Sequence, residues 1–446
     1  MTVSPFDSLI FQPLLSDSEV AVLFNDQSRV DDMVRVEAAL ARVQGSLGII
    51  PAEAAGRIDD VLARITIPAS DLAQGTADAG VPVPALVAAL RAEIGDDAAR
   101  YLHWGATSQD IMDTALILAL TRCAAILEGR LEKLIARLGA LAERHRSTVM
   151  AARTRSQQAL PTTFGLKVAG WLAPLQRHRV RLKELCPRVM TVQFGGAVGT
   201  LSALDVRGLE VMEALADELN LTSPDVPWQV QRDSIAEFAG WLSLVSASLG
   251  KMGQDLTLLA QSEVGEVREG GTGAGGQARG GSSTMPQKSN PVSSETLVAA
   301  AQFNATLLPA LHQAMLQEHE RGGAAWQLEW LSLPQMVVCT ALSLRHGLYL
   351  AENLEVDAGR MRANIEASNG LLLAEAATFA LAAHMPRPEA QALVKETCNE
   401  VMVKGRHLMD VLAEKCDAPV DWDHVRDPAN YLGVSSELID RVLRKL

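Results

Sequence analysis

The stretch from Asp110 to Arg146, DIMDTALILALTRCAAILEGRLEKLIARLGALAERHR, decides the fold class of this chain. Its apolar residues recur every three or four positions, the spacing that places side chains on one face of an α-helix. No strong helix breaker interrupts the pattern, so it predicts a helix that begins at Thr107 and is much longer than an ordinary globular helix. Several helices of this length predict an elongated bundle. Similar patterns cover residues 163–189, 232–267, 292–320 and 325–350.

The composition favours an all-helical protein in a reducing compartment. Apolar residues make up 48% of the 446 residues and aromatic residues only 4%, a mix that favours packed helices over a sheet protein. A formal net charge of −13 argues against nucleic acid as a partner. The five cysteines are scattered without CxxC spacing, which indicates reduced thiols. No secretory signal is evident, and the apolar stretch from Leu297 contains several polar residues, so we expect a soluble cytoplasmic protein without a membrane partner.

The helical patterns divide the chain into three parts. The earliest long pattern begins at Ser18 and stops at Gly48 and Pro51. We expect an N-terminal helical domain over residues 1–110, a central long-helix bundle over 111–360 and a C-terminal helical domain over 361–446. A bundle of this length has more apolar surface than one chain can cover, so we expect it to pack against copies of itself.

Three polar islands that contain glycine interrupt the helices. The first, HWGATSQDIMDT, begins at His103 and places Thr107 and Asp110 in the S/T-x-x-D arrangement of a capped helix. The second, ARTRSQQALPTTFG, begins at Ala152 and gathers arginine, serine and glutamine side chains. The third joins REGGTGAGGQAR to GGSSTMPQKSNPVSSE, which ends at Glu295. Taken singly, the first island is equally well explained as a capped helix and the second as a solvated turn.

The third island predicts a ligand-binding loop. Seven glycines lie among residues 270–281, and glycine loses the most conformational entropy on folding, so such a segment serves a ligand better than a core. Its GTGAGG run follows a helical stretch, whereas a dinucleotide site needs a strand there. The run EHERGG has the wrong spacing for a zinc helix. We therefore expect neither a cofactor nor a metal.

Together the islands resemble the three signature regions of the fumarase/aspartase superfamily. These regions read HxGxTSxD, THxQxAxP and GSSxMPxKxNPxxxE, and they correspond here to His103–Asp110, Thr154–Pro161 and Gly281–Glu295. The segment GGAVGT, residues 195–200, is similar to a further element of the superfamily. The resemblance implies an all-α fold of three helical domains, with a long central bundle that forms a twenty-helix core in a homotetramer. It also implies active sites that three subunits share.

The chemistry that this resemblance implies is proton transfer at the carbon alpha to a carboxylate, through an aci-carboxylate carbanion. Ser282 is then the general base, and Lys288 and Asn290 stabilise the dianionic carboxylate. The physics agrees, because a developing second charge on a carboxylate calls for a preorganised cation and hydrogen-bond donors. The substrate-binding residues implied are His103, Thr107, Ser108, Thr154, Arg155, Gln157, Ser283, Met285, His319 and Arg321.

The second island departs from the superfamily pattern at Arg155, where a histidine usually protonates the leaving group. The second histidine of adenylosuccinate lyase is also missing, because the corresponding region reads ADAGVPVPALVAAL. An amine leaving group with a pKa of roughly 10 needs a proton, whereas a carboxylate with a pKa of about 4 does not, and this gap is equivalent to about 8 kcal/mol. An arginine at this position therefore suits a reaction in which a carboxylate leaves or attacks.

Within the superfamily, the chain resembles the bacterial 3-carboxy-cis,cis-muconate cycloisomerases, for example in EHERGGAAWQLEWLSLPQ. That resemblance implies a small tricarboxylate substrate and a 4-carboxymuconolactone product, in the protocatechuate branch of the β-ketoadipate pathway. Glu295 then supports Arg155 by pairing with it. A C–N lyase of the adenylosuccinate or argininosuccinate type, which releases fumarate, remains the alternative. Left open are the stereochemistry of addition and whether Arg153, Arg279, Trp326 or Trp330 contact the substrate.

Overall fold

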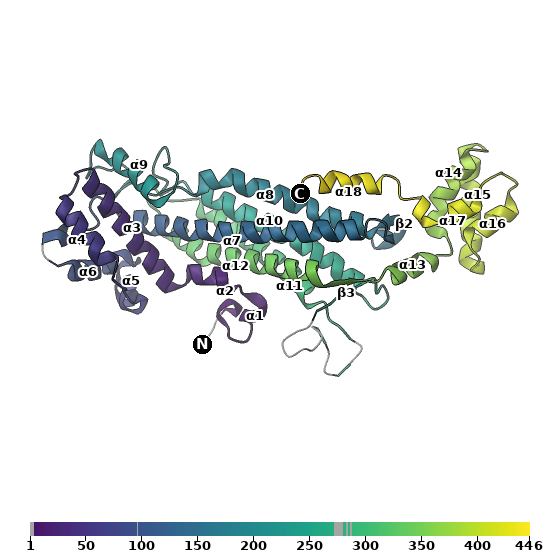
Figure 1. Cartoon of the computed structure of the whole chain (residues 1–446), viewed down its shortest axis with the longest axis horizontal. Coiled ribbons are helices and arrows are strands. Elements are labelled where there is room, and N and C mark those ends of the chain that lie inside the picture. Colours follow the sequence, from purple (N-terminus) through teal and green to yellow (C-terminus); the bar gives the residue numbers. More distant parts are fainter. Residues whose placement is uncertain (1–3, 96, 272–279, 282–283, 286–287) are drawn as a thin grey trace. The chain divides into compact units, whose positions relative to one another are not determined.

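The chain folds almost entirely into helices, as the sequence predicts (Figure 1). The computed structural model describes residues 4–95, 97–271, 280–281, 284–285 and 288–446. Contacts between Cα atoms divide the chain into two compact units. Unit 1 contains Met1–Arg130, His178–Ala247 and Ala300–Leu344, and unit 2 contains Leu131–Arg177, Ser248–Ala299 and Arg345–Leu446. The three-domain division at residues 110 and 360 remains a prediction.

Unit 1 contains a group of short helices around α3 (Asp26–Ser46), in which the label η marks 3-10 helices. The Asn25 side chain caps α3 by accepting a hydrogen bond from the Ser28 N–H, so the pattern predicted as one helix from Ser18 is broken at Asn25. The predicted stop at Gly48 is confirmed, since α3 ends just before it. The other elements are η1 (Pro5–Asp7), α1 (Gln12–Leu15), α2 (Ser18–Ala21), η2 (Val22–Phe24), α4 (Ala52–Leu62), η3 (Ala69–Leu72), α5 (Ala73–Ala79), α6 (Val83–Ile94), η4 (Asp97–Tyr101) and α9 (Arg207–Leu219).

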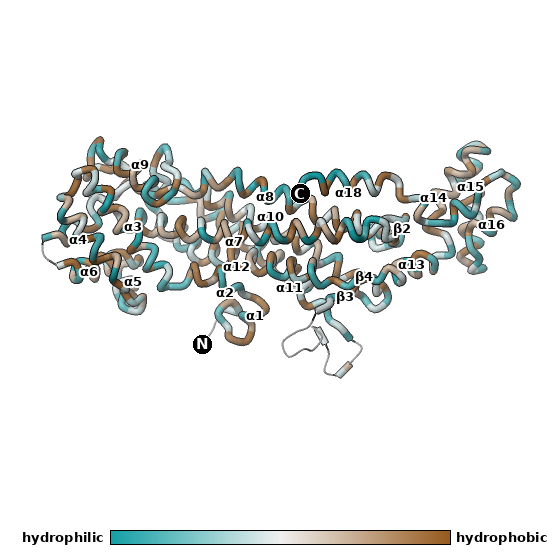
Figure 2. The backbone as a smooth tube through the Cα atoms, viewed as in Figure 1, coloured by the Kyte–Doolittle hydropathy of each residue, from teal (hydrophilic) through white to brown (hydrophobic). Residues whose placement is uncertain are grey.

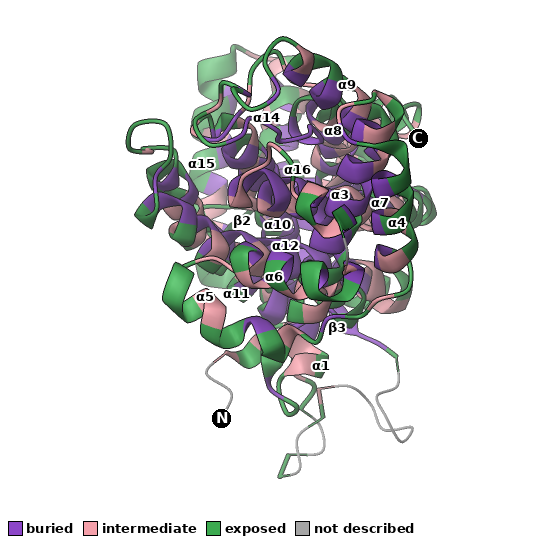
Figure 3. Ribbon diagram, turned by 90° about the vertical axis from the view of Figure 1, so that its left-hand side faces the viewer, coloured by how far each residue is buried: buried purple, intermediate pink, exposed green. Residues whose placement is uncertain are grey.

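All five predicted long helices are present. They are α7 (Ser108–Arg144), α8 (Phe164–Val189), α10 (Asp233–Leu259), α11 (Val292–Ala314) and α12 (Ala324–Asn353), and each contributes residues to both units. Two end earlier than predicted: α10 stops before a turn that contains Gly265 in a left-handed conformation, with φ of 61°, and α11 stops at Ala314. Buried residues run through α7, α10 and α12, while the outward-facing residues are exposed (Figure 3).

In unit 1, a buried polar residue joins three of the long helices. The Asn304 side chain on α11 donates hydrogen bonds to Ser246 Oγ on α10 at 3.1 Å and to Thr340 Oγ1 on α12 at 3.0 Å. Hydrophobic and hydrophilic residues alternate along these long helices (Figure 2). A buried amide must find partners, so these bonds specify which helix faces meet.

Unit 2 contains strands that the sequence pattern did not predict. Strands β1 (Val149–Thr154) and β2 (Gln157–Thr163) form an antiparallel hairpin, and β3 (Val267–Glu269) pairs with β4 (Leu354–Val356). The hairpin turn is the dipeptide Arg155–Ser156, with φ of 50° and 67°, the pattern of a type I′ turn. Asparagine and glycine usually occupy such turns, so Arg-Ser gave no hairpin signal.

The C-terminal part of unit 2 consists of short helices, and those between residues 371 and 431 surround an apolar core. These are α13 (Ala358–Glu366), η6 (Leu371–Leu373), α14 (Ala374–Ala382), α15 (Arg387–Lys404), α16 (Leu408–Lys415), α17 (Trp422–Arg426), η7 (Pro428–Asn430) and α18 (Ser435–Leu443). Across the part of the chain that the structure describes, no helix is both long enough and apolar enough to cross a bilayer.

The first turns of α11 lie close to α10 in unit 2. A Cβ atom at Gly253 on α10 would lie 2.5 Å from the Ser294 carbonyl oxygen and 2.9 Å from Leu297 Cβ. Both neighbours belong to the first turns of α11, so glycine is needed here for packing. By contrast, a Cβ atom at Gly170 on α8 would meet nothing within 4 Å.

Gly253→Ala should therefore lower the free energy of unfolding by about 1–3 kcal/mol, the usual effect of overpacking, despite the better helix propensity of alanine. The matched control Gly170→Ala should raise it by about 0.5–1 kcal/mol, because only the propensity changes. Urea denaturation at one protein concentration measures both values. Equal effects of the two substitutions would contradict the packing assignment.

Candidate active site

The first island is organised around the buried carboxylate of Asp110. This group accepts hydrogen bonds from the Thr107 N–H at 3.0 Å, from Gln193 Nε2 at 2.9 Å, and from the N–H groups of Gly195 and Gly196, each at 2.9 Å. Burial raises the pKa of Asp110 to about 6, against the effect of these donors. Half of the predicted capping arrangement is present: the Thr107 N–H donates to the Asp110 carboxylate, whereas the Thr107 hydroxyl accepts a hydrogen bond from Arg321.

His103 is held by a carboxylate that the sequence analysis did not single out. Its Nδ1 lies 2.6 Å from Oε1 of Glu37, whose side chain is fully buried, and its backbone is left-handed with φ of 63°. Burial lowers the pKa of His103, but the hydrogen bond and charge of Glu37 raise it more, so the net shift is upward. Glu37 therefore favours the protonated form of the His103 imidazole. A lone glutamate in the apolar run VEAAL was the available signal.

Two more predicted residues meet at the start of α7. Arg321 Nη1 donates to Thr107 Oγ1 at 2.7 Å, and Ser108 is the first residue of the helix. Arg321 and His319 are both exposed and belong to the segment just before α12. Unit 1 therefore brings a guanidinium, two hydroxyls and a helix N-terminus together, a set that suits an anionic ligand.

The second island forms the end of the hairpin in unit 2. Thr154 and Gln157 are cross-strand partners that flank the turn, and Arg155 is exposed at that turn. Within the described part of one chain, Arg155 forms no hydrogen bond or ion pair, and neither does the exposed side chain of Glu295 on α11. The predicted Arg155–Glu295 pair is therefore not formed within one chain, and it remains a proposal for the assembled site.

Arg153, whose role was open, has a partner inside unit 2. Its guanidinium binds the buried Glu266 carboxylate through two hydrogen bonds of 2.9 and 2.7 Å. Glu266 also accepts a hydrogen bond from Asn364 Nδ2 at 2.8 Å. This bidentate pair ties the hairpin to the residues before β3, so Arg153 supports the position of Arg155.

The third island is only partly described. Ser282, Ser283 and Arg279 lie outside the described residues. On the described side, the Asn290 N–H donates to the Gly280 carbonyl oxygen at 2.9 Å, and the Lys288 N–H donates to the Met285 carbonyl oxygen at 2.9 Å. The side chains of Lys288 and Met285 are exposed, which leaves the lysine cation available to a ligand.

Glu269 joins the two ends of this island and was missed by the sequence analysis. Its buried carboxylate accepts hydrogen bonds from the N–H groups of Ser293 and Ser294, at 3.0 and 2.8 Å, and from Ser294 Oγ at 2.7 Å. It thus caps α11 from the end of β3. Near it, Tyr349 Oη donates to the Gly270 carbonyl oxygen at 2.6 Å. The stem of the island is therefore anchored by buried polar bonds.

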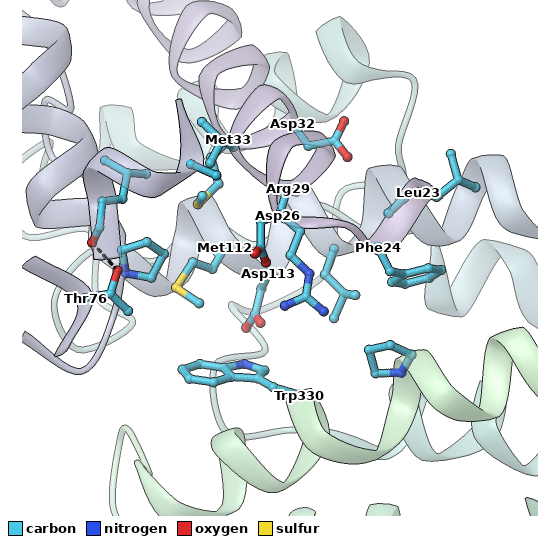
Figure 4. A pocket seen from close by; sticks show the side chains of 18 of the residues that line it. Leu23, Phe24, Asp26, Arg29, Asp32, Met33, Thr76, Met112, Asp113 and Trp330 are labelled. Atoms are coloured by element: carbon cyan, nitrogen blue, oxygen red, sulfur yellow. Dashed lines mark hydrogen bonds between the residues drawn. The ribbon is translucent and has the colours of Figure 1, made fainter. Parts of the chain in front are cut away.

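A cavity of about 370 Å³ lies in unit 1 next to the first island (Figure 4). Trp330, Met112 and Met33 contribute to its walls, whereas none of the predicted substrate-binding residues lines it. Trp330 therefore faces this cavity, and Trp326 is buried and donates its indole N–H to Asp113 at 3.1 Å. Among the described residues, no group of three or more His, Cys, Asp or Glu side chains is arranged to hold a metal ion.

Comparison with known proteins places these features in context. Residues 16–303 match a family described as lyase, and residues 370–442 match the adenylosuccinate lyase C-terminus family. A 3-carboxy-cis,cis-muconate cycloisomerase of Pseudomonas aeruginosa is 44% identical over 442 residues, which cover 97% of this chain and 95% of that protein. Trans-aconitate decarboxylase 1 of Mycosarcoma maydis is 39% identical, with 95% and 86% covered. The crystal structure of 3-carboxy-cis,cis-muconate lactonizing enzyme from Pseudomonas putida has a TM-score of 0.91 and 40% identity, with 98% and 99% covered.

The geometry around Asp110 generates a prediction about stability. In Asp110→Asn, an amide NH₂ replaces one oxygen and opposes two N–H donors, so the free energy of unfolding should fall by about 2–4 kcal/mol at pH 7. Because burial raises the pKa of Asp110 to about 6, protonation favours the folded wild type, and this gain is lost as the pH rises through 6.

The difference in the free energy of unfolding between wild type and Asp110→Asn should therefore be larger at pH 5 than at pH 7. Urea denaturation at both pH values measures it, with the exposed Asp60→Asn as control, which should match wild type at each pH. A difference that stays the same at both pH values would show that the Asp110 carboxylate is held charged at pH 5.

Proposed function

We propose that this chain, which belongs to the lyase family of the fumarase/aspartase superfamily, is a cycloisomerase that interconverts 3-carboxy-cis,cis-muconate and 4-carboxymuconolactone. The observation that carries the proposal is Arg155. It stands where the superfamily pattern has a proton-donating histidine, it is exposed at a hairpin turn, and within the described residues of one chain it is not neutralised by a carboxylate. A guanidinium in this state is suited to a substrate carboxylate.

The reaction needs charge recognition more than proton donation to a leaving group. In the lactone-forming direction, one substrate carboxylate adds to a double bond, and the resulting carbanion is stabilised by a second carboxylate before it is protonated. In the reverse direction, a carboxylate leaves, and its low pKa makes an acid unnecessary. Arg155 can hold that carboxylate through two hydrogen bonds, whereas a histidine would add a proton for which the reaction has no use.

The remaining roles follow from the three islands. We assign proton transfer at the alpha carbon to Ser282, and stabilisation of the dianionic carboxylate to Lys288 and Asn290. Thr107, Ser108 and the N-terminus of α7 suit a second carboxylate, with Arg321 beside them as a cation. The substrate is then a small tricarboxylate, and its three charges match the cations Arg155, Arg321 and Lys288.

We infer a homotetramer whose sites draw residues from three subunits, in the cytoplasm. Large apolar side chains are exposed on the long helices, which supports burial of these faces against other copies: Leu244 and Leu258 on α10, Phe303 on α11 and Leu331 on α12. All five cysteines are free thiols, as suits a reducing compartment.

A C–N lyase that releases fumarate is the second candidate, and the match of residues 370–442 to the adenylosuccinate lyase C-terminus family favours it. Against this candidate, the chain lacks an evident acid to protonate the leaving amine, because Arg155 replaces the histidine of the second island. The relative named trans-aconitate decarboxylase adds a third substrate to the assay, because it is about as similar to this chain as several cycloisomerases are.

The first functional prediction concerns activity and Arg155. The purified chain should consume 3-carboxy-cis,cis-muconate, seen as loss of the ultraviolet absorbance of the diene, and should leave adenylosuccinate and trans-aconitate unchanged. Arg155→Lys should raise KM about tenfold or more, because lysine cannot form the paired hydrogen bonds of a guanidinium. Arg144→Lys, which alters an exposed arginine in α7, is the control. Turnover of adenylosuccinate but not of the muconate would refute the assignment.

The second functional prediction concerns shared sites. Ser282→Ala and Arg155→Ala chains should each be nearly inactive alone, yet refolding them together should restore part of the activity. Some sites of the mixed tetramers would then combine an intact third island with an intact second island from another subunit. Each variant refolded with itself is the control. Light scattering that finds an active monomer would contradict both the assembly and the sharing.

A further inference from the structure

A buried arginine links the start of α7 to the start of α12 in unit 1. The side chain of Arg232 is 1% exposed and lies between two buried carboxylates. It binds Asp113 on α7 through Nη1 at 2.6 Å and Nη2 at 3.2 Å. It binds Glu329 on α12 through Nε at 2.8 Å and Nη2 at 2.6 Å. Both contacts use the planar fork of the guanidinium, so both fix direction as well as distance.

Further donors complete the coordination of Asp113. Gln109 Nε2 donates to it at 3.1 Å and also donates to the Gln229 carbonyl oxygen at 2.8 Å. The indole N–H of Trp326, on the first turn of α12, donates to Asp113 at 3.1 Å. The guanidinium of Arg232 also stacks over Trp228, with its carbon 4.7 Å from the ring centroid. Every oxygen lone pair of Asp113 thus has a donor, as a buried charge requires.

This network lies directly behind two predicted substrate-binding groups. Asp113 is less than two helical turns along α7 from Thr107. Glu329 and Trp326 lie on the opening turns of α12, immediately after the segment that carries Arg321. At the surface, the two segments are joined by the bond from Arg321 Nη1 to Thr107 Oγ1. The bonds that hold the two segments in register are therefore the buried ones.

Packing cannot replace these bonds on one side of the network. Asp113, Glu329 and Trp330 line the cavity of about 370 Å³, where Figure 4 shows Asp113 and Trp330 turned toward the open space. Side chains that line a cavity have no protein neighbour on that side, so hydrogen bonds and not packing must hold them there. Two buried carboxylates also require a cation, and a fully apolar cluster would serve stability at least as well. The main contribution of the network is therefore the relative position of α7 and α12, and not the stability of the fold.

We propose that Arg232 is a positioning residue, which sets the spacing between Arg321 and the Thr107–Ser108 end of α7. As a statement about substrate, this rests on the proposed function, because it assumes that Arg321 and Thr107 hold carboxylates. As a statement about structure, it requires only that the α12 side of the network controls the segment before α12. Arg232 touches no substrate in this proposal and acts through Arg321.

The structural part is tested by hydrogen–deuterium exchange of the whole protein without substrate. Arg232→Lys keeps the charge but cannot engage both carboxylates in a bidentate manner. Glu329→Gln keeps the size of the side chain and weakens only the α12 side, which guards against failure of the first variant to fold. In either variant, amides of residues 317–328 should exchange about tenfold faster, while those of α15 remain as in wild type. Unchanged exchange at residues 317–328 in both variants overturns the proposal.

The matched control is Arg122→Lys. Arg122 lies on α7 and, like Arg232, binds a carboxylate with both terminal nitrogens of its guanidinium, since it contacts Asp32 at 2.8 and 2.5 Å. That pair connects α7 to α3 and not to α12. Loss of its fork geometry should leave the exchange of residues 317–328 unchanged. If Arg122→Lys accelerated the exchange of residues 317–328 equally, Arg232 would have only a general structural role and the positioning role would be refuted.

The functional part is tested by steady-state kinetics on 3-carboxy-cis,cis-muconate. Arg232→Lys should raise KM about tenfold with kcat changed by less than about threefold, as expected for a weakened hydrogen bond to a substrate carboxylate. The same substitution in an Arg321→Gln background should raise KM no further, because the route of action is already removed. Additive effects on KM overturn the proposal. If the wild-type protein is inactive on the muconate, only the proposed function is refuted. The hydrogen–deuterium exchange experiment still decides whether Arg232 positions the segment before α12.

Discussion

The four hydrogen bonds received by the Asp110 carboxylate are the interaction on which the candidate site depends most. They join the first turn of α7 to the glycine segment at Gly195–Gly196, across a long stretch of sequence. Burial disfavours the charge, yet the four donors would be left unsatisfied without it. The backbone that carries His103, Thr107 and Ser108 is therefore defined by a polar centre, and the apolar core fits around that centre.

The same device recurs in the other two islands. A buried carboxylate joins distant segments in each case: Glu266 accepts hydrogen bonds from Arg153 and Asn364 behind the hairpin, and Glu269, at the end of β3, accepts hydrogen bonds from the first amides of α11. The exposed side chains to which we assign substrate binding, such as Arg155 and Lys288, thus lie on segments that are anchored by buried hydrogen bonds. This separation leaves the exposed cations available for substrate, because other charges provide the structural bonds.

The long helices were predictable because their apolar spacing is a local property of the sequence, and α7, α8 and α12 end within a few residues of the predicted limits. The site residues were named from the motifs, whose roles remain proposals. The supporting carboxylates Glu37, Glu266 and Glu269 were missed, because each partner is distant in sequence and nothing local marks the contact. The hairpin was missed because Arg155–Ser156 is an unusual pair for left-handed backbone.

That unusual turn has a consequence for the history and engineering of the protein. Side chains other than glycine are strained at positive φ, so Arg155 and Ser156 leave the hairpin less stable than asparagine and glycine would. Selection for heat resistance alone would favour those two residues and would erase the exposed guanidinium. A thermostabilisation campaign at these two positions would therefore remove the arginine to which we assign substrate binding.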